Sequence, residues 1–148
     1  MNRIIVDTNV LLYAYDPGEG SKQEQAFKVL DGLAVARRGA LTAQVLAEFS
    51  VGALRRLSSV LPADRLVASV QHYLRSWVVL DLTGLIVLEA IRGVRERKMS
   101  YYDAQIWASA RLNQIPTVFS EDFASGSTVE GVTFINPFDR DFALADWV

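Results

Sequence analysis

Hydrophobic residues along the chain recur in two patterns, one typical of short buried strands and one typical of amphipathic helices. Residues 3–6 (RIIV) contain a continuous apolar run, which suits a strand of a parallel sheet covered on both faces. Between Lys22 and Arg38, apolar side chains recur at helical spacing, and Gly39 follows as a stop signal. The same criteria predict helices at about 42–57, 62–77, 85–98 and 100–112, and strands at 77–82, 116–120 and 132–135.

Short buried strands that alternate with helices predict an α/β fold, a three-layer sandwich whose short, mainly parallel central sheet is flanked by helices. No internal repeat, low-complexity tract or linker divides the sequence, so we expect residues 1–148 to form a single domain. Functional side chains in such folds collect at the carboxyl ends of strands. Asp7 follows the first strand, and Ser120, Glu121 and Asp122 follow the strand PTVF, so both clusters should lie at one edge of the sheet.

Composition narrows the possible chemistry. The 148 residues are 51% hydrophobic. The absence of cysteine excludes thiol chemistry, and the net charge of −2 disfavours a protein that binds nucleic acid through a global positive field. The apolar runs are shorter than the roughly 20 residues that span a bilayer, and no secretion signal precedes them, so we expect a cytoplasmic protein without membrane contact. With His72 as the single histidine, carboxylates should carry any catalysis.

Two acidic residues stand in positions where a charge calls for an explanation. Asp7 interrupts the apolar stretch IIVDTNVLL, where it either caps the following helix or serves a functional site. Asp103 forms a capping-box pattern with Ser100, yet it also shares a helical face with the apolar residues Ile106 and Trp107. The cap and the functional role remain open for Asp7, and they are compatible for Asp103.

Two further acidic residues look ordinary from their local context. Glu48 points away from the apolar face of its predicted helix, which indicates a solvated side chain. Asp122 lies in the turn-rich segment SEDFASGS, where acids are common, and Glu121 beside it is an equal candidate on composition alone.

Together these segments resemble the PIN-domain ribonucleases, and most closely the VapC-type toxins of bacterial toxin–antitoxin pairs. The stretches that carry the resemblance occur in the family's order and cover nearly the whole chain. They are VDTNVLLY (6–13), TAQVLAEFSVGAL (42–54), SYYDAQIWASARLNQIPTVFSEDF (100–123) and VEGVTFINPF (129–138). The segment between Arg55 and Thr83 matches nothing distinctive, so the RNA target stays open.

The resemblance implies a PIN-like fold and an acidic metal site. The family's four acids map onto Asp7, Glu48, Asp103 and Asp122, and its supporting polar positions onto Asn9 and Ser120. Unit charges about 4 Å apart repel by about 4 kcal/mol at an effective dielectric near 20, so converging carboxylates need protons or cations. An all-oxygen ligand set favours Mg²⁺ or Mn²⁺ over zinc. On this reading Asp7 is a metal ligand that Asn9 helps to orient.

The activity implied by the resemblance is RNA hydrolysis by a metal-activated water, which leaves a 5′-phosphate and a 3′-hydroxyl. The resemblance also implies a homodimer and a small antitoxin partner. RNA could be steered by basic residues, and Tyr101 and Tyr102 could stack on bases, although each cation could equally be a solvated helix end. The basic candidates are Arg55, Arg56, Arg92, Arg95, Arg97 and Lys98.

Two other classes of function compete with this interpretation. A phosphotransfer protein also places an aspartate at a strand end, but the phosphatase pattern requires a second aspartate where Asn9 stands. A receiver domain requires a lysine late in the chain, and none follows Lys98. The second alternative is a catalytically inactive PIN fold that binds RNA or antitoxin, against which the intact acidic set argues.

Overall fold

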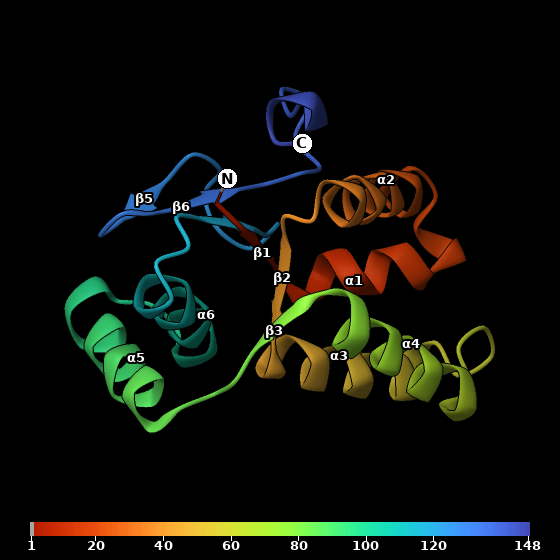
Figure 1. The fold of residues 1–148 in the computed structure, drawn as a ribbon, viewed down its shortest axis with the longest axis horizontal. Coiled ribbons are helices and arrows are strands. Elements are labelled where there is room, and N and C mark those ends of the chain that lie inside the picture. Colours follow the sequence, from red (N-terminus) through yellow and green to blue (C-terminus); the bar gives the residue numbers. More distant parts are fainter. Residues whose placement is uncertain (1) are drawn as a thin grey trace.

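A six-stranded sheet forms the centre of the computed structural model, which describes residues 2–148 (Figure 1). The strand order is β3-β2-β1-β4-β6-β5, and every neighbouring pair is parallel except β5 and β6. The strands are β1 (Ile4–Val6), β2 (Gly39–Thr42), β3 (Val78–Leu80), β4 (Thr117–Phe119), β5 (Thr128–Val129) and β6 (Val132–Ile135).

Helices cover the sheet on both sides, because parallel strands need crossover connections that place helices over the faces. In Figure 1, α1 and α2 lie on one side of the central strands, α5 and α6 lie on the other, and α3 and α4 pack together beneath. The helices are α1 (Thr8–Tyr15), α2 (Ser21–Ala36), α3 (Ala43–Arg56), α4 (Ala63–Ser76), α5 (Gly84–Arg97) and α6 (Tyr101–Leu112), with short 3-10 turns η1 (Pro17–Glu19) and η2 (Leu144–Asp146).

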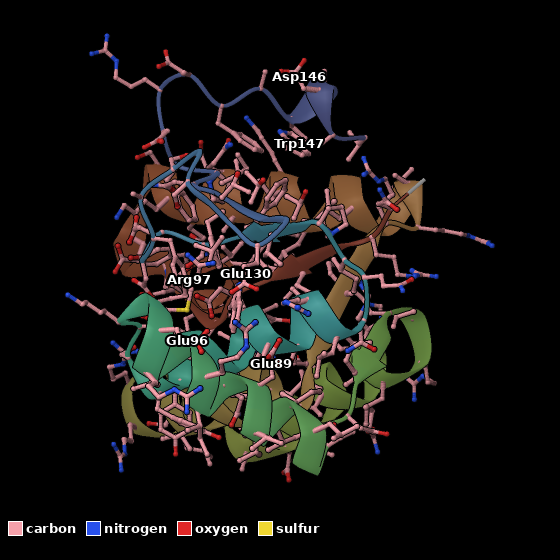
Figure 2. All side chains as sticks on the ribbon, turned by 90° about the vertical axis from the view of Figure 1, so that its left-hand side faces the viewer. Glu89, Glu96, Arg97, Glu130, Asp146 and Trp147 are labelled. Atoms are coloured by element: carbon pink, nitrogen blue, oxygen red, sulfur yellow. The ribbon has the colours of Figure 1, made fainter. Side chains whose placement is uncertain are left out.

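The core is centred on the sheet. Every residue of the central strands β1 and β4 is buried. Phe49 of α3 and Trp107 of α6 are its largest fully enclosed side chains outside the sheet. The C-terminal segment closes one end, where Trp147, labelled in Figure 2, packs edge-on against Phe119. The α/β sandwich predicted from the hydrophobic pattern is confirmed.

The strand β2 was not predicted, because Gly39 was interpreted as the end of the preceding helix. That helix ends earlier, at Ala36, and Arg37 adopts the left-handed conformation that usually favours glycine. Gly39 instead begins a buried strand against the indole of Trp77, whose Cζ3 would lie 2.2 Å from an added Cβ. The glycine is therefore required for close packing.

The strand β5 was also not predicted, and the residues that mark it are those of its turn. Glu130 and Gly131 have φ values of 48° and 84°, and they connect Val129 to Val132, which face each other in the antiparallel pair. Two consecutive positive φ values define a tight two-residue hairpin. The predicted strand at 132–135 is confirmed as β6.

The predicted helix at 85–98 is confirmed, but the apolar residues that mark it do not pack on the core. Leu85, Leu88 and Ile91 are 71%, 64% and 52% exposed, while α5 buries Ile86 and Ala90 instead. α5 lies mainly along α6 and not on the sheet (Figure 1). Within residues 2–148, no helix is long and apolar enough to cross a membrane.

Candidate active site

Asp7 lies at the carboxyl end of β1, at the point where the strand order changes direction. β1 pairs with β2 on one side and with β4 on the other, and the chain moves outward from β1 in both directions. The crevice at such a switch point is the usual ligand site of an open α/β sheet. The backbone N–H of Asp7 donates to the carbonyl of Phe119 at 2.9 Å, so the ends of β1 and β4 meet as predicted.

Hydrogen bonds hold both carboxylate oxygens of Asp7. The backbone N–H of Thr8 donates to Oδ1 at 2.7 Å, which makes Asp7 the N-cap of α1. The hydroxyl of Ser120 donates to Oδ2 at 2.7 Å, and Ser120 is itself fully buried. Asp7 is thus a helix cap and a site candidate at once, and its rotamer is fixed by the first residue of α1 and by the residue that follows β4.

The electrostatic environment of Asp7 opposes its ionisation. Burial raises its pKa from 3.8 to about 6, and the two hydrogen bonds from Ser120 and Thr8 only partly offset this. The negative charges of Asp122 and Glu48 raise the pKa further, which places both acids within electrostatic range. In the described chain, 2–148, no lysine, arginine or histidine forms an ion pair with these three acids.

The two adjacent acids after β4 have different partners. Glu121 accepts hydrogen bonds from Tyr13 at 2.5 Å and from Lys22 at 2.6 Å. Burial opposes ionisation of Glu121, but these two bonds outweigh it and lower the pKa. The backbone N–H of Asp122 instead donates to Ser120 Oγ at 3.1 Å, the hydroxyl that holds Asp7. The structure therefore favours Asp122 over Glu121 as the acid coupled to Asp7.

Glu48 lines a groove of about 1070 Å³ between α1, α3 and α6. Its Oε1 accepts a hydrogen bond from the side chain of Gln44 at 2.6 Å, so the carboxylate of the solvated side chain expected from periodicity is held at one oxygen. Thr8, the neighbour of Asp7, also lines this groove, as do Arg55 and Arg56.

Asp103 occupies the first turn of α6, and the predicted capping box does not form. Ser100 has the backbone conformation of an N-cap, but its side chain makes no capping hydrogen bond. Tyr102 and Gln105, on either side of Asp103, line the groove. The largest charge effects on the pKa of Asp7 come from Asp122 and Glu48. The pKa of Asp7 thus responds to Glu48 and Asp122, and Asp103 stands one residue from Tyr102 of the groove lining.

Asn9 does not contact Asp7 in the way that the sequence suggested. Its two amide atoms and the hydroxyl of Thr8 are enclosed, and they have no hydrogen-bond partner among residues 2–148. Ser120 performs the orienting role that had been expected of Asn9. Unpaired enclosed polar atoms are costly, so Asn9 and Thr8 are the polar groups beside Asp7 that remain available to a ligand or water.

The basic candidates fall into two groups. Arg55 and Arg56 end α3 and line the groove with Glu48. The candidates on α5 belong to an ion-pair network with acids of α5 and of the β5–β6 turn; Figure 2 labels four of its members, and their side chains gather beside α5. Its pairs are Arg92 with Glu89, Glu96 and Glu130, Arg95 with Glu96, Arg97 with Glu130, and Arg111 with Glu89 and Glu130. Lys98, at the C-cap of α5, is exposed in the left-handed conformation.

Sequence reasoning missed two residues that belong to this site, the amides Gln44 and Gln105. Both are buried, at 8% and 4% exposure, and Gln105 donates to Gln44 Oε1 at 2.8 Å. Their sequence signal is a polar residue on the buried face of a helix, since Gln105 lies directly before Ile106 and Trp107. Buried amides require partners, and Gln44 finds them on its own helix, in Glu48, and on α6, in Tyr102 and Gln105.

The donor chemistry of the site fits a hard divalent cation. The groups at the edge of β1 and β4 are carboxylates and a hydroxyl, and the buried Asp7 has no basic partner among the described residues to offset its charge. No three acidic or histidine side chains in residues 2–148 are already gathered to hold a metal ion. A cation would require the exposed side chains of Glu48 and Asp122 to close on Asp7.

Comparison with known proteins assigns the fold to a family. Residues 4–124 match the family model described as PIN domain, so the chain belongs to the PIN domain family. No curated protein matches the sequence significantly.

Among solved structures, the chain is similar to the toxin VapC20 of Mycobacterium tuberculosis, described as cleaving the sarcin-ricin loop. The two are 21% identical with a TM-score of 0.65, over 86% of this chain and 97% of that one. A toxin–antitoxin complex from Klebsiella pneumoniae is 19% identical with a TM-score of 0.66, over 92% and 98%. DNA-bound VapBC from Salmonella typhimurium is 20% identical with a TM-score of 0.63, over 90% and 97%. These likenesses concern the fold.

Proposed function

We propose that this protein is a metal-dependent endoribonuclease and the toxin of a toxin–antitoxin pair. The observation that carries the proposal is Asp7, a buried carboxylate with a pKa raised to about 6 and two further acids within electrostatic range. A perturbed acid at a sheet switch point beside a large groove is typical of a functional site. Membership of the PIN domain family supports the assignment.

The residues that would hold Mg²⁺ or Mn²⁺ are Asp7, Asp103, Asp122 and Glu48. When bound, such an ion supplies positive charge that offsets the charge of a scissile phosphate and makes water a better nucleophile at neutral pH. Ser120 and the N–H of Thr8 hold Asp7 in one rotamer and favour its ionised form. Their role would be to keep a ligand preorganised before RNA binds.

RNA would bind along the groove that Glu48 lines. Arg55 and Arg56 lie in the same lining and would attract the phosphate backbone toward the acids. Tyr102 lies there as well, 64% exposed, so its ring is available to stack on a base. This arrangement supports a single-stranded segment as the substrate, because stacking on an aromatic ring requires an unpaired base.

A small antitoxin that covers the groove follows from the same proposal. A structure with this fold from Klebsiella pneumoniae is described as a toxin–antitoxin complex, and those from Salmonella typhimurium and Rickettsia felis are described as VapBC and VapBC2 bound to DNA. The apolar residues Leu12, Val51 and Leu82 in the groove lining suit a partner helix as well as RNA. A homodimer acting in the cytoplasm completes the proposal.

The decisive experiment maps cleaved RNA ends after controlled expression of the wild type and of Asp7→Asn. We expect new 5′-phosphate ends in the wild type and at least a thousandfold fewer in the variant, because an amide cannot replace the anionic ligand. Purified protein with added Mg²⁺ or Mn²⁺ should reproduce the cleavage.

A matched pair of neighbouring acids provides the control. Asp122→Asn should reduce cleavage strongly, whereas Glu121→Gln should retain it, since Glu121 is bound by Lys22 and Tyr13. Full cleavage by Asp7→Asn would refute the proposed site. No cleavage by either the wild type or the variant, with RNA binding intact, would favour the inactive binding module.

A further inference from the structure

Two buried glutamines connect the helix that carries Glu48 with the helix that carries Asp103. Gln44 of α3 donates to Glu48 Oε1 at 2.6 Å and to the backbone carbonyl of Tyr102 at 3.1 Å. Gln105 of α6 donates to Gln44 Oε1 at 2.8 Å. The result is a continuous chain of hydrogen bonds that starts in α6 and ends on an acid of the groove.

The orientation of the Gln44 amide is determined by its surroundings. Its nitrogen faces two acceptors, Glu48 Oε1 and the carbonyl of Tyr102, and its oxygen faces the donor from Gln105. A flipped amide would place oxygen against both acceptors and nitrogen against a donor. Both hydrogens of the Gln44 amide nitrogen are therefore committed, and one of them always points at Glu48.

Packing alone does not explain these amides. Burying an amide between helices costs free energy unless each polar atom is paired, and apolar residues of similar volume fill such a space without that requirement. Gln44 and Glu48 are also four residues apart on α3, which places them on one helical face. A buried polar chain that ends on an exposed acid is suited to orienting that acid.

We infer that Gln44 is a positioning residue that directs Glu48 toward the metal site, and that Gln105 anchors it from α6. This inference rests on the proposed function, because it requires Glu48 to act as a ligand. Gln44 lines the groove, but both hydrogens of its amide nitrogen are bonded to Glu48 and to the carbonyl of Tyr102, so it acts on the site through Glu48. It restricts a side chain that is otherwise free to rotate in solvent, so that less conformational freedom is lost when the cation binds.

The test measures Mn²⁺ affinity by titration calorimetry on the purified full chain without RNA. Gln44→Met should weaken Mn²⁺ binding about tenfold or more, which is the usual effect of removing a hydrogen-bond partner of a metal ligand. Gln105→Met should weaken it less, because the bond from Gln44 to Glu48 remains. The matched control is Gln25→Met, which removes a half-buried glutamine outside the groove lining that donates to the carbonyl of Pro137 at 2.9 Å.

A double-mutant cycle distinguishes positioning from general loosening of the fold. In a Glu48→Gln background, Gln44→Met should have little further effect on Mn²⁺ affinity, because the carboxylate that it orients is absent. Equal effects in both backgrounds, or unchanged affinity in Gln44→Met, would overturn the inference. If Gln44→Met does not fold, the same cycle with Gln105→Met decides the question.

The failure of the proposed function has a different signature. If the wild type binds no Mn²⁺, or if Asp7→Asn binds it equally well, the metal site itself is wrong and the inference fails with it. If the wild type binds Mn²⁺ through Asp7 while Gln44→Met is indistinguishable from it, only the role of Gln44 is refuted.

Discussion

Two groups of acids on this molecule experience opposite electrostatic environments. At the edge formed by β1 and β4, the buried Asp7 has acidic neighbours, and its pKa rises to about 6. On the other side of the molecule, Glu130 in the β5–β6 turn accepts a two-pronged interaction from Arg92 at 2.9 and 3.0 Å, and its pKa falls to about 2. Glu130 is stabilised as an anion by the fold, whereas Asp7 is not.

The two groups of acids differ in whether arginines are paired with them. Arg92, Arg97 and Arg111 all reach Glu130, and they connect α5 and α6 to the hairpin. Figure 2 labels Arg97 and Glu130 of this group. The charges of this network neutralise one another, so its role is to hold the helices and the hairpin together. The acids around Asp7 receive none of these arginines. An uncompensated cluster destabilises the protein unless a cation binds, and a fold tolerates that cost mainly at a functional site.

The same contrast recurs between two adjacent residues. Glu121 is neutralised by Lys22, whereas Asp122 raises the pKa of Asp7. Lys22 also lies over the ring of Tyr13 at 4.9 Å, which joins the loop after β4 to α1 and α2. Pairing Glu121 in this way fixes the loop that carries Asp122.

The largest expected effect on stability comes from Asp7→Asn without metal. The folded pKa of about 6 exceeds the ordinary 3.8, so ionised Asp7 destabilises the wild type by up to about 3 kcal/mol at pH 7. The variant should gain roughly 1–3 kcal/mol in free energy of unfolding, measured by denaturant titration with a chelator. Lower stability of the variant at pH 7 would show that Asp7 is already compensated.

The pH dependence follows from the sign of the shift. A raised folded pKa means that the stability contributed by the protonated group is complete below pH 4 and is lost as pH rises through about 6. The gain from Asp7→Asn should therefore vanish below pH 4. Saturating Mn²⁺ should reverse the order at pH 7 by stabilising the wild type alone.

An intermediate effect is expected on RNA binding, where the two groups of arginines should differ. Replacing Arg55 and Arg56 together by glutamine should weaken binding of a single-stranded RNA about tenfold at low salt, or about 1.4 kcal/mol, and reduce the salt slope by about 2. Binding is measured in the Asp7→Asn background by fluorescence anisotropy. The matched control Arg97→Gln, whose charge is paired with Glu130, should change neither quantity appreciably.

The smallest effect is expected from Glu130→Gln, and its sign is opposite to that of Asp7→Asn. Removing the acid that three arginines share should lower the free energy of unfolding by about 1 kcal/mol, as for a partly exposed network. Because the folded pKa is lowered to about 2, this contribution is present above about pH 4.5 and is lost as pH falls toward 2. Asp31→Asn, an exposed acid within α2, is the control and should have little effect.

Much of the fold follows from the sequence, because the hydrophobic period reports local conformation and burial together. The strand over 4–6 and the helix capped by Thr42 were predictable from a few residues each. β2 was missed because Gly39 is ambiguous by itself. Gly39 leaves room for the indole of Trp77, which lies 38 positions later in the chain. No local sequence pattern reveals that contact.

The sequence predicted which residues belong to the candidate site better than it predicted the hydrogen bonds among them. The resemblance of several motifs placed Asp7, Glu48, Asp103 and Asp122 in one set, although periodicity gave Glu48 no role. The resemblance named both Asn9 and Ser120 as supporting polar residues and assigned Asn9 to orient Asp7, whereas the hydrogen bond comes from Ser120, far along the chain. Hydrogen bonds between strands depend on sheet order, which adjacency does not reveal.

The sequence by itself determined the alternation of strands and helices and the acidic character of the candidate site. These follow from side-chain type and from spacings of two to four residues, which the backbone converts directly into faces and edges. The family followed from the resemblance of four motifs in order along the chain. Only the tertiary structure decided which charges are neutralised: that Arg92 binds Glu130, that Lys22 binds Glu121, and that Asp7 has no such partner among residues 2–148. The physical reason is that electrostatic energy depends on distance and burial in three dimensions, and the order of residues fixes neither for groups a hundred positions apart.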